Sequence, residues 1–171
     1  NYATATDSYN TTVGARAGEA ISTGAKNTLV GALAGDAYNT SNNNVAVGYA
    51  ALSSDTKGTK NVAVGFEALL DQNQTTNTDS YNVAVGYHAG TNVTTGIYNV
   101  LIGALAGDAI TDADFNVAVG TNTLSTNVLG SQNVAIGNGA LYTMNPATAA
   151  DTYNTAVGAT AGNLLTTGVR N

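Results

Sequence analysis

The chain has no cysteine and no tryptophan, and only one proline, one methionine and two phenylalanines among its 171 residues. Without cysteine it can form no disulfide, no thiolate metal site and no cysteine nucleophile. Only 9% of the residues are charged, with five Lys and Arg against eleven Asp and Glu. Five cations cannot form the basic stripe that binds a phosphate backbone, so we expect no nucleic-acid partner.

Long hydrophobic runs and catalytic residue types are also missing. No apolar run approaches the ~18 residues of a membrane-spanning helix, so we expect no membrane insertion in this segment. The single histidine, His88, stands at a repeat position that Arg16 and Glu67 also occupy, which is typical of a solvated site. With one histidine and no cysteine, the chain has too few of the residues from which catalytic triads and zinc sites are built. We therefore predict no enzyme activity, no cofactor and no metal.

An Asn-x-x-(Val/Ile)-Gly motif recurs through the chain. Its asparagines are Asn10, Asn27, Asn44, Asn61, Asn82, Asn99, Asn116, Asn133 and Asn154. They follow one another at 17 residues, except at the two 21-residue steps that end at Asn82 and Asn154, and Asn171 stands where another copy would begin. The two steps recur 72 residues apart, as does the segment Gly31–Ala37 at Gly103–Ala109. Four motifs therefore make one 72-residue super-repeat.

The repeat predicts the fold. A 17-residue unit is too short for two helices, and its best-kept part, such as Asn44–Gly48, is rich in β-branched residues. Units that cannot bury a face alone must stack. We predict an all-β parallel β-solenoid with one repeat per coil, spanning residues 1–171 as one segment of a longer array. The motif asparagines would form an axial ladder of side-chain amides, with coils ~4.8 Å apart.

The strands are apolar on both faces, which predicts burial on both faces. One face can fill the lumen of the solenoid, and the other needs a cover, so we expect a homotrimer. Periodicity alone does not fix which face points inward. We assign the third position after each Asn to the lumen because it is always β-branched and aliphatic. The predicted solenoid core is Val47, Val64, Val85, Ile102, Val119 and Ile136.

The segments Asn44–Leu52, Asn61–Leu69 and Asn133–Leu141 resemble the head repeats of YadA-type trimeric autotransporter adhesins. They also resemble the repeat arrays of phage-type tail-fibre proteins, which the 17-residue coil and the 72-residue period favour. The resemblance implies an extracellular, non-enzymatic fibrous protein: the shaft or head of a tail fibre or surface appendage, acting as a stiff multivalent rod. The alternative is the head of a bacterial trimeric adhesin that binds host or matrix surfaces. The location would be a virion tail fibre or the bacterial cell surface.

Two sets of aromatic residues share a repeat position on three consecutive coils. The first set is Tyr49, Phe66 and Tyr87, and the second is Tyr81, Tyr98 and Phe115. Such rows can bind a carbohydrate, or they can pack as ladders that shield the sheet or join subunits. We regard the packing role as the stronger interpretation and keep these six residues as candidate ligand-binding residues. The partner would be a cell-surface carbohydrate or a protein receptor.

The two 21-residue steps contain insertions that must leave the coil. Their tips are expected at Asn73–Asn77 and Asn145–Ala149, as binding loops or as clasps between subunits. Asp112 and Asp114 lack the spacing of a calcium loop. An ice-binding solenoid would need a regular threonine column, and a hexapeptide acyltransferase an aliphatic residue at every sixth position. Neither pattern is present.

Overall fold

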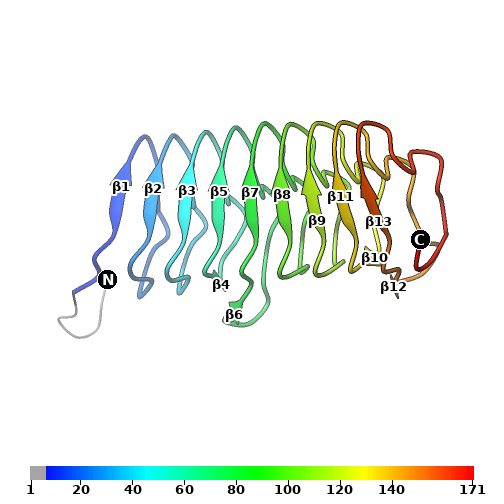
Figure 1. Cartoon of the computed structure of the whole chain (residues 1–171). Coiled ribbons are helices and arrows are strands. Elements are labelled where there is room, and N and C mark those ends of the chain that lie inside the picture. Colours follow the sequence, from blue (N-terminus) through cyan, green and yellow to red (C-terminus); the bar gives the residue numbers. More distant parts are fainter. Residues whose placement is uncertain (1–6) are drawn as a thin grey trace.

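The computed structural model describes residues 7–171, which form a rod of stacked coils (Figure 1). No helix occurs in that range, and the strands are parallel. The predicted all-β parallel solenoid with one coil per repeat is therefore confirmed. The predicted solenoid unit begins at residue 1, and its residues 1–6 lie outside the described residues. We number the coils 1 to 9 from Asn10 to Asn154.

One nine-stranded sheet runs along the rod, and each of its strands starts directly after a motif asparagine (Figure 1). The strands are β1 (Thr11–Val13), β2 (Thr28–Val30), β3 (Val45–Val47), β5 (Val62–Val64), β7 (Val83–Val85), β8 (Val100–Ile102), β9 (Val117–Val119), β11 (Val134–Ile136) and β13 (Thr155–Val157). Neighbouring strands pair residues of the same repeat position, so Val62 lies between Val45 and Val83. The 21-residue steps keep this register because their extra residues leave the coil elsewhere.

Each insertion ends in a short strand that pairs with the preceding coil. Strand β6 (Thr78–Asp79) pairs with β4 (Gly58–Thr59), and β12 (Ala150–Asp151) pairs with β10 (Gly130–Ser131). The loop before β6 bulges from the side of the rod (Figure 1). Main-chain pairing thus returns the chain to the next motif asparagine in register.

Side chains of the main sheet alternate between a buried middle residue and two outer residues that are partly exposed. The buried middle residues are Leu29, Ala46, Ala63, Ala84, Leu101, Ala118, Ala135 and Ala156. The assignment of the third position to the core is therefore wrong. Val47, Val64, Val85, Ile102, Val119 and Ile136 point outward, and Ile102 and Ile136 are 38% and 39% exposed.

The reason for this inversion is the motif asparagine. Asn82 and Asn99 are fully buried, so their side chains point into the rod. Successive residues of a strand point to opposite faces. The second residue after each Asn must then point inward with it, whereas the first and third must point outward.

The far side of the lumen is filled by two positions that vary together. The residue eight after each Asn is glycine in coils 1, 2, 5, 6 and 9 and leucine in coils 3, 4, 7 and 8. Glycine coils carry a large apolar residue three positions later, such as Val93 after Gly90. Leucine coils carry Asp55, Gln72, Asn127 or Met144 there. Two glycine coils followed by two leucine coils account for the four-coil period.

Candidate functional site

The motif asparagines form a continuous hydrogen-bonded row inside the rod. The side-chain Oδ1 of each one accepts a hydrogen bond from the backbone N–H of the next, at 2.8–3.1 Å, from Asn10 to Asn171. In six coils Nδ2 donates to the backbone carbonyl fourteen residues ahead, as in Asn82 to Gly96 at 2.7 Å. The row therefore links mainly side chain to backbone, and the expected amide-to-amide bonds occur at two steps, where Asn133 Nδ2 donates to Asn116 Oδ1 and Asn171 Nδ2 to Asn154 Oδ1, both at 3.0 Å. Its function is to hold successive coils together.

A buried polar network interrupts the apolar lumen in coils 3 to 5. Asp55 Oδ1 accepts from the backbone N–H groups of Gly58 and Lys57, at 2.8 and 3.3 Å, and Oδ2 accepts from Gln72 Nε2 at 3.0 Å. Gln72 Oε1 in turn accepts from Asn82 Nδ2 at 2.8 Å. Burial raises the pKa of Asp55 above its usual value, against the opposing effect of these hydrogen bonds. The network has no access to solvent and is structural.

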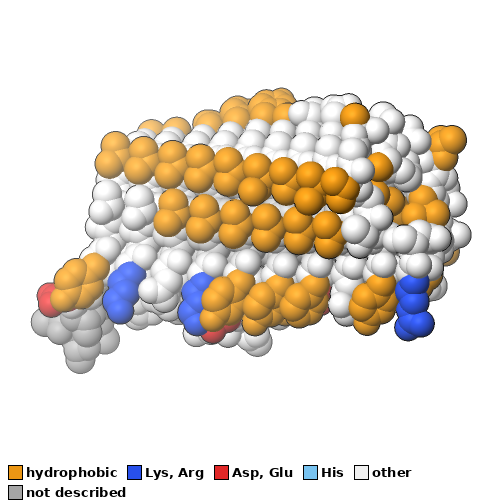
Figure 2. Space-filling model, in the orientation of Figure 1, with side chains coloured by type: hydrophobic (Ala, Val, Ile, Leu, Met, Phe, Trp, Pro, Cys, Tyr) orange, Lys and Arg blue, Asp and Glu red, His pale blue; other side chains and the backbone are white. Residues whose placement is uncertain are grey.

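The outer face of the main sheet carries two uninterrupted aliphatic rows, which we call the valine face. Its first-position residues are Val45, Val62, Val83, Val100, Val117 and Val134, and its third-position residues are Val30, Val47, Val64, Val85, Ile102, Val119 and Ile136. Figure 2 shows the rows as parallel hydrophobic bands along the rod. No charged residue belongs to either row. A contiguous exposed band of this length is typical of an interaction surface.

The two aromatic sets form stacked ladders on the surface. In the Tyr49 stack (Tyr49, Phe66 and Tyr87) the ring centroids are 5.2 and 5.5 Å apart, with planes within 17° of parallel. In the Tyr81 stack (Tyr81, Tyr98 and Phe115) they are 5.2 and 4.9 Å apart. Nearly parallel rings at these distances turn their faces to one another. The middle rings thus have both faces occupied. Of the end rings, Tyr81 also contacts Lys60 Nζ, 4.9 Å from its centroid, and Tyr87 contacts the His88 ring, 4.1 Å away.

The Tyr81 stack lies at a strained backbone position. The residue before each motif asparagine has a left-handed backbone, with φ of 52° at Tyr81, 57° at Tyr98 and 56° at Phe115. This conformation costs a non-glycine residue about 1 kcal/mol. Ring stacking offsets that cost, as does Lys60, whose Nζ lies 4.9 Å from the Tyr81 ring centroid.

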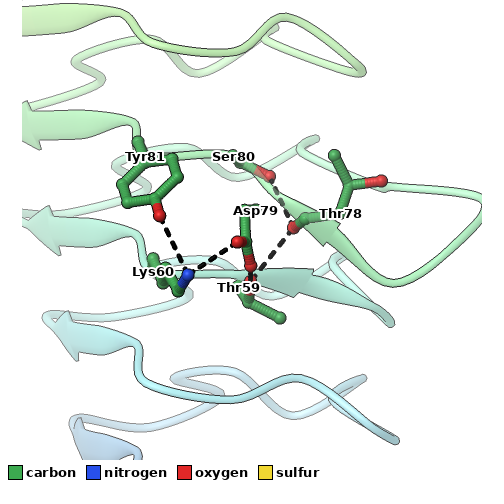
Figure 3. A network of polar contacts seen from close by, with 6 residues as sticks. All are labelled: Thr59, Lys60, Thr78, Asp79, Ser80 and Tyr81. Carbon is green, nitrogen blue, oxygen red and sulfur yellow. Dashed lines mark hydrogen bonds and ion pairs between the residues drawn. The ribbon is translucent and has the colours of Figure 1, made fainter.

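The first insertion is fastened to the rod by a network around β4 and β6 (Figure 3). Lys60 Nζ donates to Asp79 Oδ2 at 2.6 Å and to the Tyr81 hydroxyl at 2.9 Å. Thr59 Oγ1 donates to Asp79 Oδ1 at 2.6 Å. The pKa of the exposed Asp79 is lowered, and the largest cause is the hydrogen bond from the Lys60 ammonium. The clasp fixes the root of the insertion.

The predicted tips of the insertions also contact the rod. Asn77 Oδ1 accepts from Thr40 Oγ1 at 2.6 Å, and the Thr75 carbonyl accepts from Lys57 Nζ at 3.0 Å. In the second insertion Asn145 Oδ1 accepts from the Val128 N–H at 3.2 Å. Asn73–Asn77 therefore folds back over coils 2 and 3. Its place in a binding site or a subunit clasp stays a prediction.

His88 is not isolated from other polar groups. Its Nε2 lies 3.2 Å from Glu67 Oε2 on the preceding coil, and its ring is 4.1 Å from that of Tyr87. From the sequence we predicted no role for His88, because its repeat position holds many residue types. No sequence pattern indicated that His88 pairs with Glu67. Within residues 7–171 no three His, Asp or Glu side chains are grouped as a metal site, and no pocket is present.

Comparison with protein-family models, with curated proteins and with solved structures gave no match. Within residues 7–171 there is also no helix long and apolar enough to cross a membrane. The surfaces that remain as functional candidates are the valine face, the ends of the two aromatic stacks and the insertions.

Proposed function

We propose that this chain is the rod-forming part of a fibrous, non-enzymatic extracellular protein, and that it works as a parallel homotrimer joined through the valine face. The observation that carries the proposal is the valine face itself. It is apolar, uncharged and continuous over seven strands, from β2 to β11, and it follows the same axis as the asparagine row.

The burial of that face explains its composition. On a single rod the valine and isoleucine side chains of this face are partly in water. Burying them lowers the free energy by about 25 cal/mol for each Å² of apolar surface removed from water. A second copy has the same repeat spacing, so parallel coils in register bring valine rows against valine rows along the whole length. Antiparallel or shifted copies would place the polar end residues, Thr11, Thr28 and Thr155, against valines. Parallel, in-register packing is therefore favoured.

The resemblance to trimeric repeat proteins supports three copies rather than two. Of the two appendages, the 17-residue coil and the 72-residue period favour a phage-type tail fibre over a bacterial adhesin head. In either, the rod sets the reach of the fibre, and sites repeated on three chains raise avidity without tight individual contacts.

The oligomeric state tests this proposal. We expect the double variant Val83→Asp, Val100→Asp to be monomeric, because it places two carboxylates in the centre of the face. The control is Thr23→Asp, Thr95→Asp, which adds the same charge at exposed positions away from the sheet and from the insertions and should leave the assembly intact. Light scattering after size exclusion measures both. Assembly of the valine double variant as in the parent would contradict the proposal.

A further inference from the structure

The two aromatic stacks follow opposite edges of the valine face. Members of the Tyr81 stack come directly before a motif asparagine, and members of the Tyr49 stack come two residues after the third-position row. Tyr81 and Tyr87 therefore lie beyond opposite ends of β7, more than about 10 Å apart. Within residues 7–171, every ring contact among the six aromatic residues joins members of the same stack. The two stacks do not meet on one chain.

The two stacks are also offset along the rod, and they share only coil 5. The Tyr49 stack covers coils 3 to 5, whereas the Tyr81 stack covers coils 5 to 7. Coil 5 is the one coil with an aromatic residue on both edges of the valine face. In the other coils of either stack the opposite edge carries a non-aromatic residue, such as Ala104 opposite Tyr98 in coil 6. Each stack thus begins or ends in the coil where the other ends or begins.

The symmetry of a parallel assembly brings the two edges together. Copies that are parallel and in register are related by rotation about an axis along the rod. This rotation sets the starting edge of one valine face beside the finishing edge of the next, which is a heterologous contact that closes into a ring. Residues of the same coil then meet at the same height. Tyr81 of one copy faces Tyr87 of the next in coil 5, and Lys60 faces Glu67, its opposite in charge, in coil 4.

We propose that the two stacks form one seam between copies of the chain, in which the Tyr81 stack of one copy meets the Tyr49 stack of the next at coil 5. The inference rests on the proposed parallel assembly and adds the contacts that flank the valine rows. Both rings at the junction have surface to bury, since Tyr81 is 40% and Tyr87 is 55% exposed on a single rod. Aromatic pairs contribute beyond the area that they bury. The seam thus fixes which edges and which coils of neighbouring copies meet.

Cysteine cross-linking tests the seam, because the chain has no cysteine of its own. The double variant Gln132→Cys, Asn138→Cys places one thiol on each edge of coil 8. The two positions lie beyond opposite ends of β11, too far apart for a disulfide within one chain. Oxidation should therefore link neighbouring copies, and a denaturing gel without reductant should show a covalent species of three chains. The control Gln132→Cys, Ala104→Cys separates the thiols by two coils, about 9.6 Å along the rod, and should stay unlinked.

Sedimentation of the same variants before oxidation separates the seam from the assembly itself. A trimer in which the coil 8 pair stays unlinked, or in which the control pair links equally well, would overturn the seam and leave the proposed function standing. A monomer would overturn both. A covalent species of two chains would support the seam and contradict an assembly of three.

The seam also predicts that Tyr81 and Tyr87 are energetically coupled, although they do not contact each other within one chain. Tyr81→Ala and Tyr87→Ala should each weaken assembly by about tenfold. The double variant should weaken it by less than the product of the two single effects, because either change already removes the contact between copies. Concentration-dependent sedimentation measures all four proteins. Effects of the two changes that simply multiply would overturn the proposed junction at coil 5.

Discussion

The side-chain Oδ1 of Asn82 accepts a hydrogen bond from the backbone N–H of Asn99, 2.8 Å away in the next coil. The same bond joins Asn61 to Asn82 at 3.0 Å, across a 21-residue step. The hydrogen bond between successive motif asparagines is therefore kept whether 17 or 21 residues separate them. This explains how insertions occur without loss of register in the main sheet.

We expect Asn82→Ala to be among the most damaging single changes in the row. It leaves the Asn99 N–H, the Gly96 carbonyl and Gln72 Oε1 buried without their partner. Each unsatisfied group costs about 1–3 kcal/mol, so we expect a loss of several kcal/mol in thermal or denaturant melts. His88→Ala, which removes the partly exposed pair with Glu67 and the ring contacts with Tyr87 and Phe66, should cost less, about 1 kcal/mol. A larger effect at His88 than at Asn82 would contradict the structural role of the row.

Two glycines allow the effect of steric crowding on stability to be measured apart from the effect of a left-handed backbone. Gly90 and Gly139 both have left-handed backbones, with φ of 59° and 64°. A Cβ at Gly90 would lie 2.6 Å from Leu101 Cδ1, whereas at Gly139 the nearest atom is 3.9 Å away. We expect Gly90→Ala to lower the free energy of unfolding by about 1–3 kcal/mol more than Gly139→Ala. Equal losses in urea melts would show that the lumen is not tightly packed there.

The stability of the rod should depend on Asp55 at acidic pH. Burial raises its pKa in the folded state above the usual value of about 3.9. The folded chain then binds this proton more tightly than the unfolded chain. The contribution to stability is full below the usual pKa and is lost as the pH rises through the raised pKa.

Asp55→Asn should remove that part of the pH dependence and still fold, because Asn127 occupies the corresponding position in the second super-repeat. There Asn127 Nδ2 donates to the Gly130 carbonyl at 2.7 Å, and Oδ1 accepts from the Gly130 N–H at 2.9 Å. Urea melts of both proteins from pH 3 to pH 8 measure the difference. Parallel stability curves would show that Asp55 titrates normally.

Two adjacent residues of β7 test the direction of the strand faces. Ala84 is fully buried and Val85 is partly exposed. We expect Ala84→Asp to cost several kcal/mol, because it places an unpaired carboxylate in the lumen. Val85→Asp should leave the melting of an isolated chain almost unchanged and should weaken assembly instead. Circular dichroism melts at low protein concentration distinguish the two. A larger loss of stability from Val85→Asp than from Ala84→Asp would show that the third position after each Asn, and not the second, faces the lumen.

Much of the fold follows from the sequence, because the motif spacing fixes the coil length and the register of strands such as β5 against β3 and β7. The direction of the faces did not follow, since both sets of alternating residues are apolar. A buried Asn at the start of each strand decides it, but a polar residue at a turn is ordinarily expected in water. The contact of the His88 ring with the Tyr87 ring, 4.1 Å away, was equally inaccessible to sequence reasoning, because it depends on the geometry of the two side chains.

The central claim is that the valine face is covered by further copies of the chain. Sedimentation equilibrium of the chain at micromolar concentration tests it most directly, because it measures mass independently of shape. We predict a single species with three times the 17.1 kDa mass of the chain. A stable and soluble species with the mass of one chain, over the whole concentration range, would contradict it.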